Sequence, residues 1–165
     1  MRCPLLLVLV SVLYSQPHWP RFEQYSTTEK VSGKPAPPIL KTPGDRLFRT
    51  VIREGAAKGP NFAGHYTIVE WGCGSACVSI AVVDAKTGQI RESPFSILGY
   101  GTSLKFPDGT RTHADEFEEL AYRLSSRLLI VRGCPEDKGC GAYYYEWTGS
   151  RFKLLHKGAA VVDRK

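Results

Sequence analysis

Two pairs of cysteines, each preceded by a run of strand-forming residues, constrain the fold of this chain more than any other feature. The segment that ends at Cys73 (TIVEWGC) matches the segment that ends at Cys134 (LLIVRGC) at an offset of 61 positions. Each segment is followed by a second cysteine, another apolar run, a Thr-Gly turn and a further apolar run. The repetition predicts two related β modules. Because a propeller needs about four or more blades, an antiparallel sheet or a sandwich is the better expectation.

The cysteine spacing favours disulfides over a metal. Cys73 and Cys77, and likewise Cys134 and Cys140, are spaced unlike the usual zinc ligands, and no histidine accompanies either pair closely. If each cysteine pairs with its near neighbour, the two disulfides would each close the end of a hairpin. Four cysteines allow three connectivities, however, and the sequence leaves the choice open. We therefore expect a disulfide-stapled domain with no metal site and no cofactor.

The N-terminus has the pattern of an export signal. Arg2 precedes an uncharged, mainly apolar run from Leu5 to Ser15, which is shorter than the roughly 20 residues of a membrane-spanning helix. We expect residues 1–16 to be a signal peptide that takes Cys3 with it, and no transmembrane anchor after its cleavage. The predicted location is periplasmic or extracellular, where thiols pair.

The charge of the chain narrows the class of partner. Its net charge is +6, and the lysines and arginines are scattered along the sequence. Proteins that bind nucleic acid usually cluster such charge, so nucleic acid is disfavoured as a partner. An anionic polysaccharide or an envelope protein fits a weakly basic domain better.

Proline divides the rest of the chain into two parts. Residues 17–43 contain six prolines. Proline has no backbone N–H, so a segment such as Lys34-Pro35 can neither start a helix nor join a central strand. We therefore expect this segment to be an extended strap that packs less well than the rest of the domain. Trp19, Phe22 and Tyr25 are expected to pin its start. Residues 44–165 are expected to form one domain of about the commonest size.

Periodicity predicts a mainly β (α+β) domain with one N-terminal amphipathic helix. Leu47, Phe48, Val51 and Ile52 follow Asp45 with the spacing of an apolar helical stripe, which Gly55 or Gly59 would end. From His65 onward, runs of β-branched and aromatic residues are bounded by turns that contain glycine. The predicted strands cover residues 66–71, 78–83, 128–132, 142–147 and 152–155.

A longer pattern resembles a known group of proteins. The residues from Gly59 to Tyr66 (GPNFAGHY), continuing into Trp71 to Cys77 (WGCGSAC), resemble a group of uncharacterised exported bacterial proteins. The similarity extends over roughly residues 45–156, including Arg127 to Cys134 and Tyr144 to Trp147. It implies export and a β fold, and it implies no activity, ligand or catalytic residue.

Catalytic motifs are missing from the sequence. His65 and Glu70 come nearest to an acid–base pair, but their odd separation places them on opposite faces of one strand. A hydrogen-bonded structural role for His65 is favoured, and Asp84 and Asp108 are expected to stabilise turns. We assign no catalytic residue, and an enzyme is the less favoured interpretation.

The aromatic residues are the richer signal for function. Tyr143, Tyr145 and Trp147 fall on one face of a strand, and the repeat places Trp71 and Arg132 at equivalent positions of the two modules. Such rings can fill a core or stack on sugars equally well, and the core is favoured because few other large residues are available to fill a small β domain. If they are exposed, they form with His65 and Arg132 a binding face for an anionic envelope glycan. The predicted function is thus an exported binding module, with a small secreted hydrolase or a structural envelope protein as alternatives.

Overall fold

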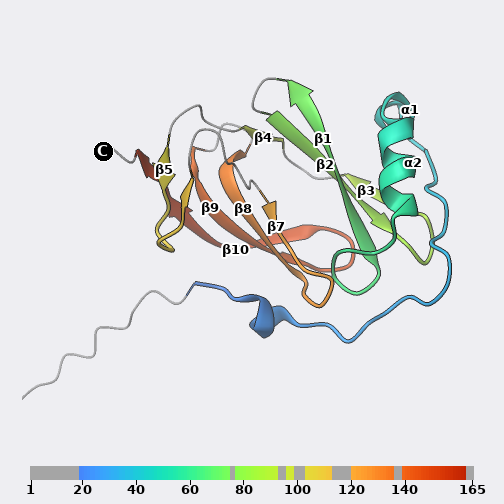
Figure 1. Ribbon diagram of the computed structural model, residues 1–165, viewed down its shortest axis with the longest axis horizontal. Helices are drawn as coiled ribbons and strands as arrows, with labels where there is room; N and C mark the ends of the chain where they lie inside the picture. The colour runs from blue at the N-terminus through green and yellow to red at the C-terminus, as the bar shows by residue number, and fades with distance from the viewer. Residues whose placement is uncertain are drawn as a thin grey trace, which may run out of the picture.

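The computed structural model describes residues 19–74, 77–92, 96–98, 103–112, 120–135 and 139–162 (Figure 1). The predicted signal peptide lies outside these residues. The described chain is mainly β, and all its strand pairs are antiparallel. This confirms that the domain is mainly β and antiparallel, as predicted.

Five long strands form two blocks of the main sheet. One block is the hairpin of β1 (Tyr66–Gly74) and β2 (Cys77–Asp84), and the other contains β8 (Leu128–Pro135), β9 (Gly141–Trp147) and β10 (Phe152–Ala159). Every predicted strand lies within one of these five. The strand order along the sheet is β1-β2-β4-β8-β9-β10, so the short strand β4 joins the two blocks. The short strands are β3 (Ile90–Glu92), β4 (Ile97–Leu98), β5 (Leu104–Lys105), β6 (Arg111–Thr112), β7 (Leu120–Ala121) and β11 (Val161–Val162).

The two blocks have the same internal order, which is a strand, a cysteine-bearing loop, a second strand, a Thr-Gly turn and a third strand. The short strand β3, which pairs with β2, follows the turn after the first block, and β10, which pairs with β9, follows the turn in the second. The order matches the sequence repeat. A common origin of the two modules remains a prediction.

Side-chain alternation along the strands builds three apolar clusters. The central cluster joins one face of β1 and β2 to one face of β8 and β9. The outer face of β1 and β2 packs on a helix, and the outer face of β8 and β9 packs on the N-terminal strap and β5. Successive residues of β9 show the principle, because Tyr143 and Tyr145 enter the central cluster and Tyr144 enters the outer one. The order of layers is therefore helix, β block, β block and strap.

The predicted single helix is two helices. Helix α1 (Pro43–Leu47) is capped by Asp45, whose carboxylate accepts hydrogen bonds of 2.8 Å from the backbone N–H groups of Lys41 and Thr42. The chain leaves helical geometry at Phe48, and α2 (Arg49–Ala57) follows. Because of this break, Leu47 is 74% exposed, which corrects its place in the predicted stripe. The buried residues of α2 are Ile52 and Ala56. Gly59, one of the two expected stop positions, has a φ of +92°.

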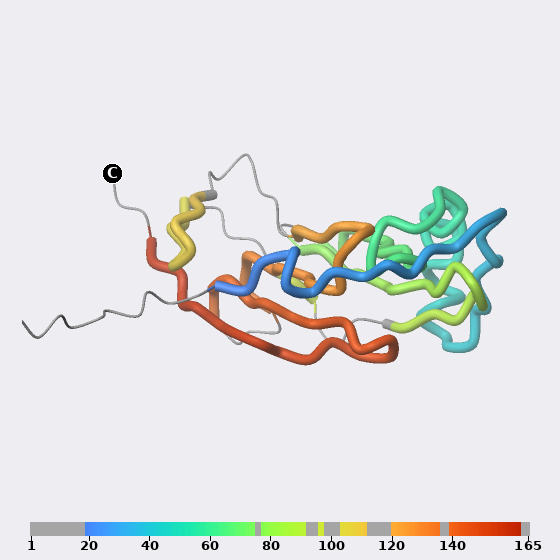
Figure 2. Tube along the Cα trace, turned by 90° about the horizontal axis from the view of Figure 1, so that it is seen from below, coloured from blue at the N-terminus to red at the C-terminus, as the bar shows by residue number. Residues whose placement is uncertain are grey.

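The strap runs along the length of the molecule from the β10 side to α1 (Figures 1 and 2). None of residues 19–43 is fully buried. Trp19, Phe22 and Tyr25 nevertheless pack on the outer cluster of β8 and β9, which confirms that they pin its start. The last two belong to a short 3₁₀ helix, η1 (Phe22–Tyr25).

Backbone contacts hold the strap at defined points. The N–H of Thr27 donates to the carbonyl of Ser125, and the N–H of Ala36 donates to the carbonyl of Ala85. Two glycines with positive φ allow the closest approaches. A Cβ atom on Gly64 would collide with the carbonyl of Glu29, and one on Gly88 would collide with the carbonyl of Pro37. The strap therefore follows a path that these glycines leave open.

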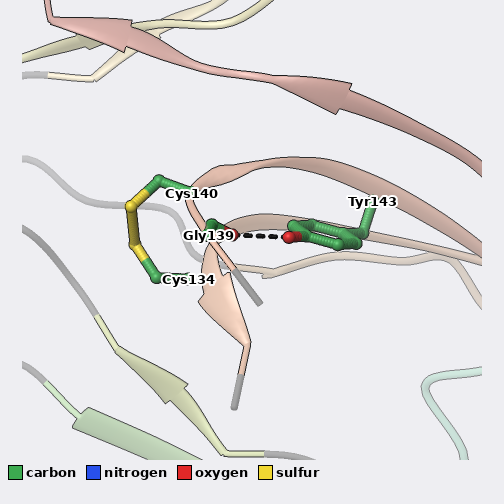
Figure 3. The surroundings of a disulfide bond; sticks show 4 residues. All are labelled: Cys134, Gly139, Cys140 and Tyr143. Atoms are coloured by element: carbon green, nitrogen blue, oxygen red, sulfur yellow. Dashed lines mark hydrogen bonds between the residues drawn. A yellow bond between two sulfur atoms is a disulfide. The ribbon is translucent and has the colours of Figure 1, made fainter. Parts of the chain in front are cut away.

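Both disulfides are local. Cys73 pairs with Cys77, and Cys134 pairs with Cys140, with Cα–Cα distances of 5.1 and 4.1 Å. This decides between the connectivities that the sequence left open. The first bond lies at the end of the β1–β2 hairpin. The second lies where β8 leads into β9, next to the hydrogen bond that the hydroxyl of Tyr143 donates to the carbonyl of Gly139 (Figure 3).

Candidate functional site

Three of the predicted binding residues are core residues. The side chains of Tyr143, Tyr145 and Trp147 lie in the central cluster and are 1%, 7% and 2% exposed. Stacking on a sugar requires an exposed ring. In this structure the rings fill the space between the two β blocks.

The remaining aromatic and the arginine lie elsewhere. Trp71 points to the outer side of β1, where its ring centroid is 5.0 Å from that of Phe48. Arg132 lies opposite Ala142 in the β8–β9 register and therefore shares a face with Tyr144, on the side away from Tyr143 and Tyr145. The structure does not bring the predicted binding residues together on one surface.

His65 is buried and contacts both the strap and the first β block. Its side chain is 9% exposed, with Nδ1 at 2.9 Å from Glu29 Oε2 and Nε2 at 3.7 Å from Asp84 Oδ1. The contact of Nδ1 with Glu29 is close but not aligned as a hydrogen bond. Lys86 Nζ lies 3.0 Å from the same Glu29 oxygen. The ammonium group of Lys86 is the main cause that lowers the pKa of Glu29, and the nearby His65 lowers it further.

Glu70, the other half of the sequence-level acid–base pair, has a different neighbour. Its Oε1 accepts a hydrogen bond of 2.7 Å from the hydroxyl of Tyr122, at an exposed position. His65 and Glu70 therefore occupy separate environments, as the odd separation indicated. Neither faces the cleft described next.

A cleft of about 680 Å³ lies between the strap and the outer face of β8 and β9. We call it the strap cleft. Residues 19–23 of the strap form one wall, and Pro107, Asp108 and Thr110 of the β5–β6 turn form another. The remaining lining residues are Arg123, Ile130, Arg132 and Tyr144. Arg132 is the single predicted binding residue in this lining.

Three side chains form a polar cluster in the strap cleft. Asp108 Oδ2 lies 3.2 Å from Arg132 Nη2 and accepts a hydrogen bond of 2.7 Å from the hydroxyl of Tyr144. Asp108 Oδ1 accepts a hydrogen bond of 3.0 Å from the N–H of Thr110, which confirms its expected turn role. The carboxylate of Asp108 and the guanidinium of Arg132 belong to side chains that are only 11% and 15% exposed.

The cluster determines the charge state of its members. Burial disfavours the ionised form of Asp108, but the hydrogen bonds from Thr110 and Tyr144 and the charge of Arg132 outweigh burial and lower the pKa of the carboxyl group. Burial raises the pKa of Tyr144, and its hydrogen bond to Asp108 raises it further. At neutral pH the cluster therefore contains an ionised Asp108, a charged Arg132 and a neutral phenol.

The strap supplies rings and further charges. Trp19 stacks on Tyr144 with centroids 5.7 Å apart and an interplanar angle of 28°. Arg123 lies over the ring of Phe22 at 4.3 Å and pairs with Glu23 at 3.1 Å. Arg21 is exposed, and none of the described carboxylates forms an ion pair with it.

The sequence predicts only part of this cleft. The period-two pattern of β9 selects the neighbours of Tyr144 as the aromatic face and sends Tyr144 to the other face, where Arg132 lies. The turn chemistry of Asp108 predicts its contact with Thr110 but not those with Arg132 and Tyr144. Trp19 is predicted to be an anchor, but no pattern in the sequence indicates which face of the sheet it covers.

Within the described residues, no three or more His, Cys, Asp or Glu side chains are grouped as a metal site would require. No helix in that part of the chain is long and apolar enough to span a membrane.

Comparisons with known proteins add no relative. No protein-family model matches the chain, and no curated protein and no solved structure matches it either.

Proposed function

We propose that this protein is an exported binding module and that its strap cleft takes an acidic saccharide unit of an anionic envelope glycan. The observation that carries the proposal is the Arg132–Asp108–Tyr144 cluster beside the ring of Trp19 in a cleft of about 680 Å³. Ligand sites are typically clefts of about 300–1,000 Å³ with a few placed polar groups.

Burying an arginine and an aspartate costs desolvation free energy, even when the two side chains form an ion pair. Such a pair stabilises a fold little more than apolar residues of the same size would. Their presence in the lining of a cleft is better explained by recognition. Asp108 orients the guanidinium through Nη2, and the Nε–H of Arg132 is buried with no acceptor among the described residues. A guanidinium has five N–H donors in a fixed plane, so Arg132 has more donors than its contact with Asp108 uses.

The rest of the cleft suits a charged ring. Trp19 and Phe22 present aromatic surface on which the C–H face of a sugar can pack. The cleft lining contains three arginines and two carboxylates, so its balance is positive. Arg21 adds a cation that no described carboxylate neutralises, which favours an anionic ligand over a neutral one.

Export is supported by three independent features of the chain. The N-terminus has a signal-peptide pattern, the resemblance noted above is to exported proteins, and the described cysteines form two disulfides. Disulfides are typical of oxidising compartments.

The test is retention of the protein on an immobilised polymer of uronic acids, compared with a neutral glucan. We expect salt-sensitive retention on the acidic polymer alone, because salt screens exposed charges. Arg21→Ala should reduce retention while the fold is unchanged, since this side chain is exposed. Arg151→Ala removes an exposed arginine from the β9–β10 turn and is the matched control. Equal retention of the two variants, or equal retention on both polymers, would overturn the proposal.

A further inference from the structure

A second hollow lies on the other side of the molecule's layered fold, between α2 and the later part of the strap. We call it the helix hollow. Its volume is about 540 Å³, and it is separate from the strap cleft in its lining. The strap contributes Pro35 to Pro38, and the helix contributes Ala56 and Ala57.

The local sequence makes this hollow apolar. Three of its four consecutive strap residues are prolines, which have no backbone N–H. The fourth, Ala36, donates its N–H to the carbonyl of Ala85 at 2.8 Å. The strap segment 35–38 therefore offers no unused backbone donor to the hollow.

Small helix residues leave the space open. Ala56 and Ala57 both line the hollow, although Ala56 is 2% exposed and also packs on β1 and β2, and a larger side chain at Ala57 would fill the gap. The strap cannot collapse freely onto them, because the N–H of Ala36 is bound to Ala85 and that of Ile39 donates to the carbonyl of Gly88 at 2.8 Å. Hydrogen bonds on either side of Pro37 and Pro38 thus hold the strap at the edge of the hollow.

The charged residues of the hollow have one sign. Lys34 and Arg53 complete its lining, both are exposed, and no carboxylate belongs to that lining. Within the described part of the chain, neither side chain forms an ion pair. An apolar surface with two uncompensated cations at its edge is complementary to a molecule with an aliphatic body and an anionic head.

We propose that the helix hollow binds a free single-chain anionic amphiphile of the fatty-acid type. The alkyl chain packs on the prolines and alanines, and the carboxylate lies between Lys34 and Arg53. This site is independent of the proposed glycan site, because the two cleft linings share no residue.

The experiment is calorimetric titration of the whole mature protein with dodecanoate below its micelle concentration. Dodecyltrimethylammonium, which has the same chain and the opposite charge, is the comparison probe. We expect dodecanoate to bind with 1:1 stoichiometry and the cation to bind at least about tenfold more weakly. Anionic vesicles added in place of dodecanoate distinguish a membrane surface from the free amphiphile. Binding to vesicles alone would contradict the proposal.

Two substitutions place the ligand in the hollow. Ala57→Leu fills the space with a good helix former, and we expect it to reduce dodecanoate affinity about tenfold or more. Thr50→Leu adds the same side chain at another exposed position of α2, outside the hollow, and should leave affinity unchanged. If both leucine variants bind dodecanoate as the wild type does, the chain lies elsewhere and the proposal fails.

Charge reversal tests the head group. The double variant Lys34→Glu with Arg53→Glu should lose dodecanoate binding and gain binding of dodecyltrimethylammonium. Arg49→Glu changes the charge of the same helix outside the hollow and should keep the wild-type preference. An unchanged preference in the double variant would overturn the assignment of the two cations. Circular dichroism of each variant checks that its fold is retained.

Discussion

The hydroxyl of Tyr144 donates a hydrogen bond of 2.7 Å to the carboxylate of Asp108, which is 36 residues earlier in the chain. The bond joins β9 to the β5–β6 turn. With Arg132 it forms a polar connection beside the apolar cluster on the outer face of β8 and β9. Both the stability and the pH response of the strap cleft follow from it.

Asp108→Asn should destabilise the protein by about 2 kcal/mol at pH 7, because Arg132 and Tyr144 lose a charged partner. The pKa of Asp108 is lowered in the folded state, so this stabilisation is present above its unfolded pKa of about 3.9 and is lost as the pH falls through the folded value. Urea unfolding of wild type and variant across acidic pH should show the two stabilities converge. Glu70→Gln removes an exposed carboxylate that also accepts from a tyrosine and is the control. A difference that is independent of pH would contradict this account.

Trp147→Ala should cost about 3–5 kcal/mol, because the ring is 2% exposed and packs on Phe152 with centroids 4.8 Å apart. Trp71→Ala should cost less, since that side chain is half-buried. Denaturant unfolding followed by far-UV circular dichroism measures both. A Trp147→Ala protein of wild-type stability would show that this ring is not part of the core.

Gly88→Ala should loosen the strap, because the new Cβ would collide with the carbonyl of Pro37. Limited proteolysis should then cut the segment 27–40 faster than in the wild type. Gly109→Ala is the control, because Gly109 also has a positive φ but a Cβ atom there would have no atom within 4 Å. Any difference between the two variants is therefore due to the collision and not to backbone strain. Equal cleavage rates in the two variants would indicate that the strap does not depend on this approach.

Reduction of the native protein should open Cys73–Cys77 before Cys134–Cys140. The side chain of Cys73 is exposed, whereas that of Cys134 is buried, with 4% of its surface exposed. Exposed disulfides react more readily with thiols. Alkylation after mild reduction, followed by peptide mass spectrometry, should label Cys73 and Cys77 first. Earlier labelling of Cys134 would contradict the burial of the second bond.

The strands could be predicted because their signal is local. Alternation and turn residues are contained in the sequence around each strand, so all five long strands were identified. The helix break was not, because Leu47 and Ile52 fit one apolar stripe, and only packing shows that Leu47 is exposed.

The candidate site could not be predicted because it depends on how the strands pair with one another. Which face Arg132 shares with the tyrosines of β9 depends on the β8–β9 register, and that register follows from the length of the loop between the strands. The sequence pattern placed Arg132 with Tyr143, and the register places it with Tyr144. The aromatic residues of the strap predict that its start is anchored, but the strap has no periodicity that indicates which face of the sheet it covers.

The short span of each disulfide also affects how the chain matures. The sulfurs of each pair are separated by four and six positions in sequence, and the probability that two thiols meet falls as the intervening chain lengthens. Each bond can therefore form within its own hairpin before the two β blocks have met. Native pairing is then also the fastest pairing, and the chain has little need of isomerisation to correct its cross-links.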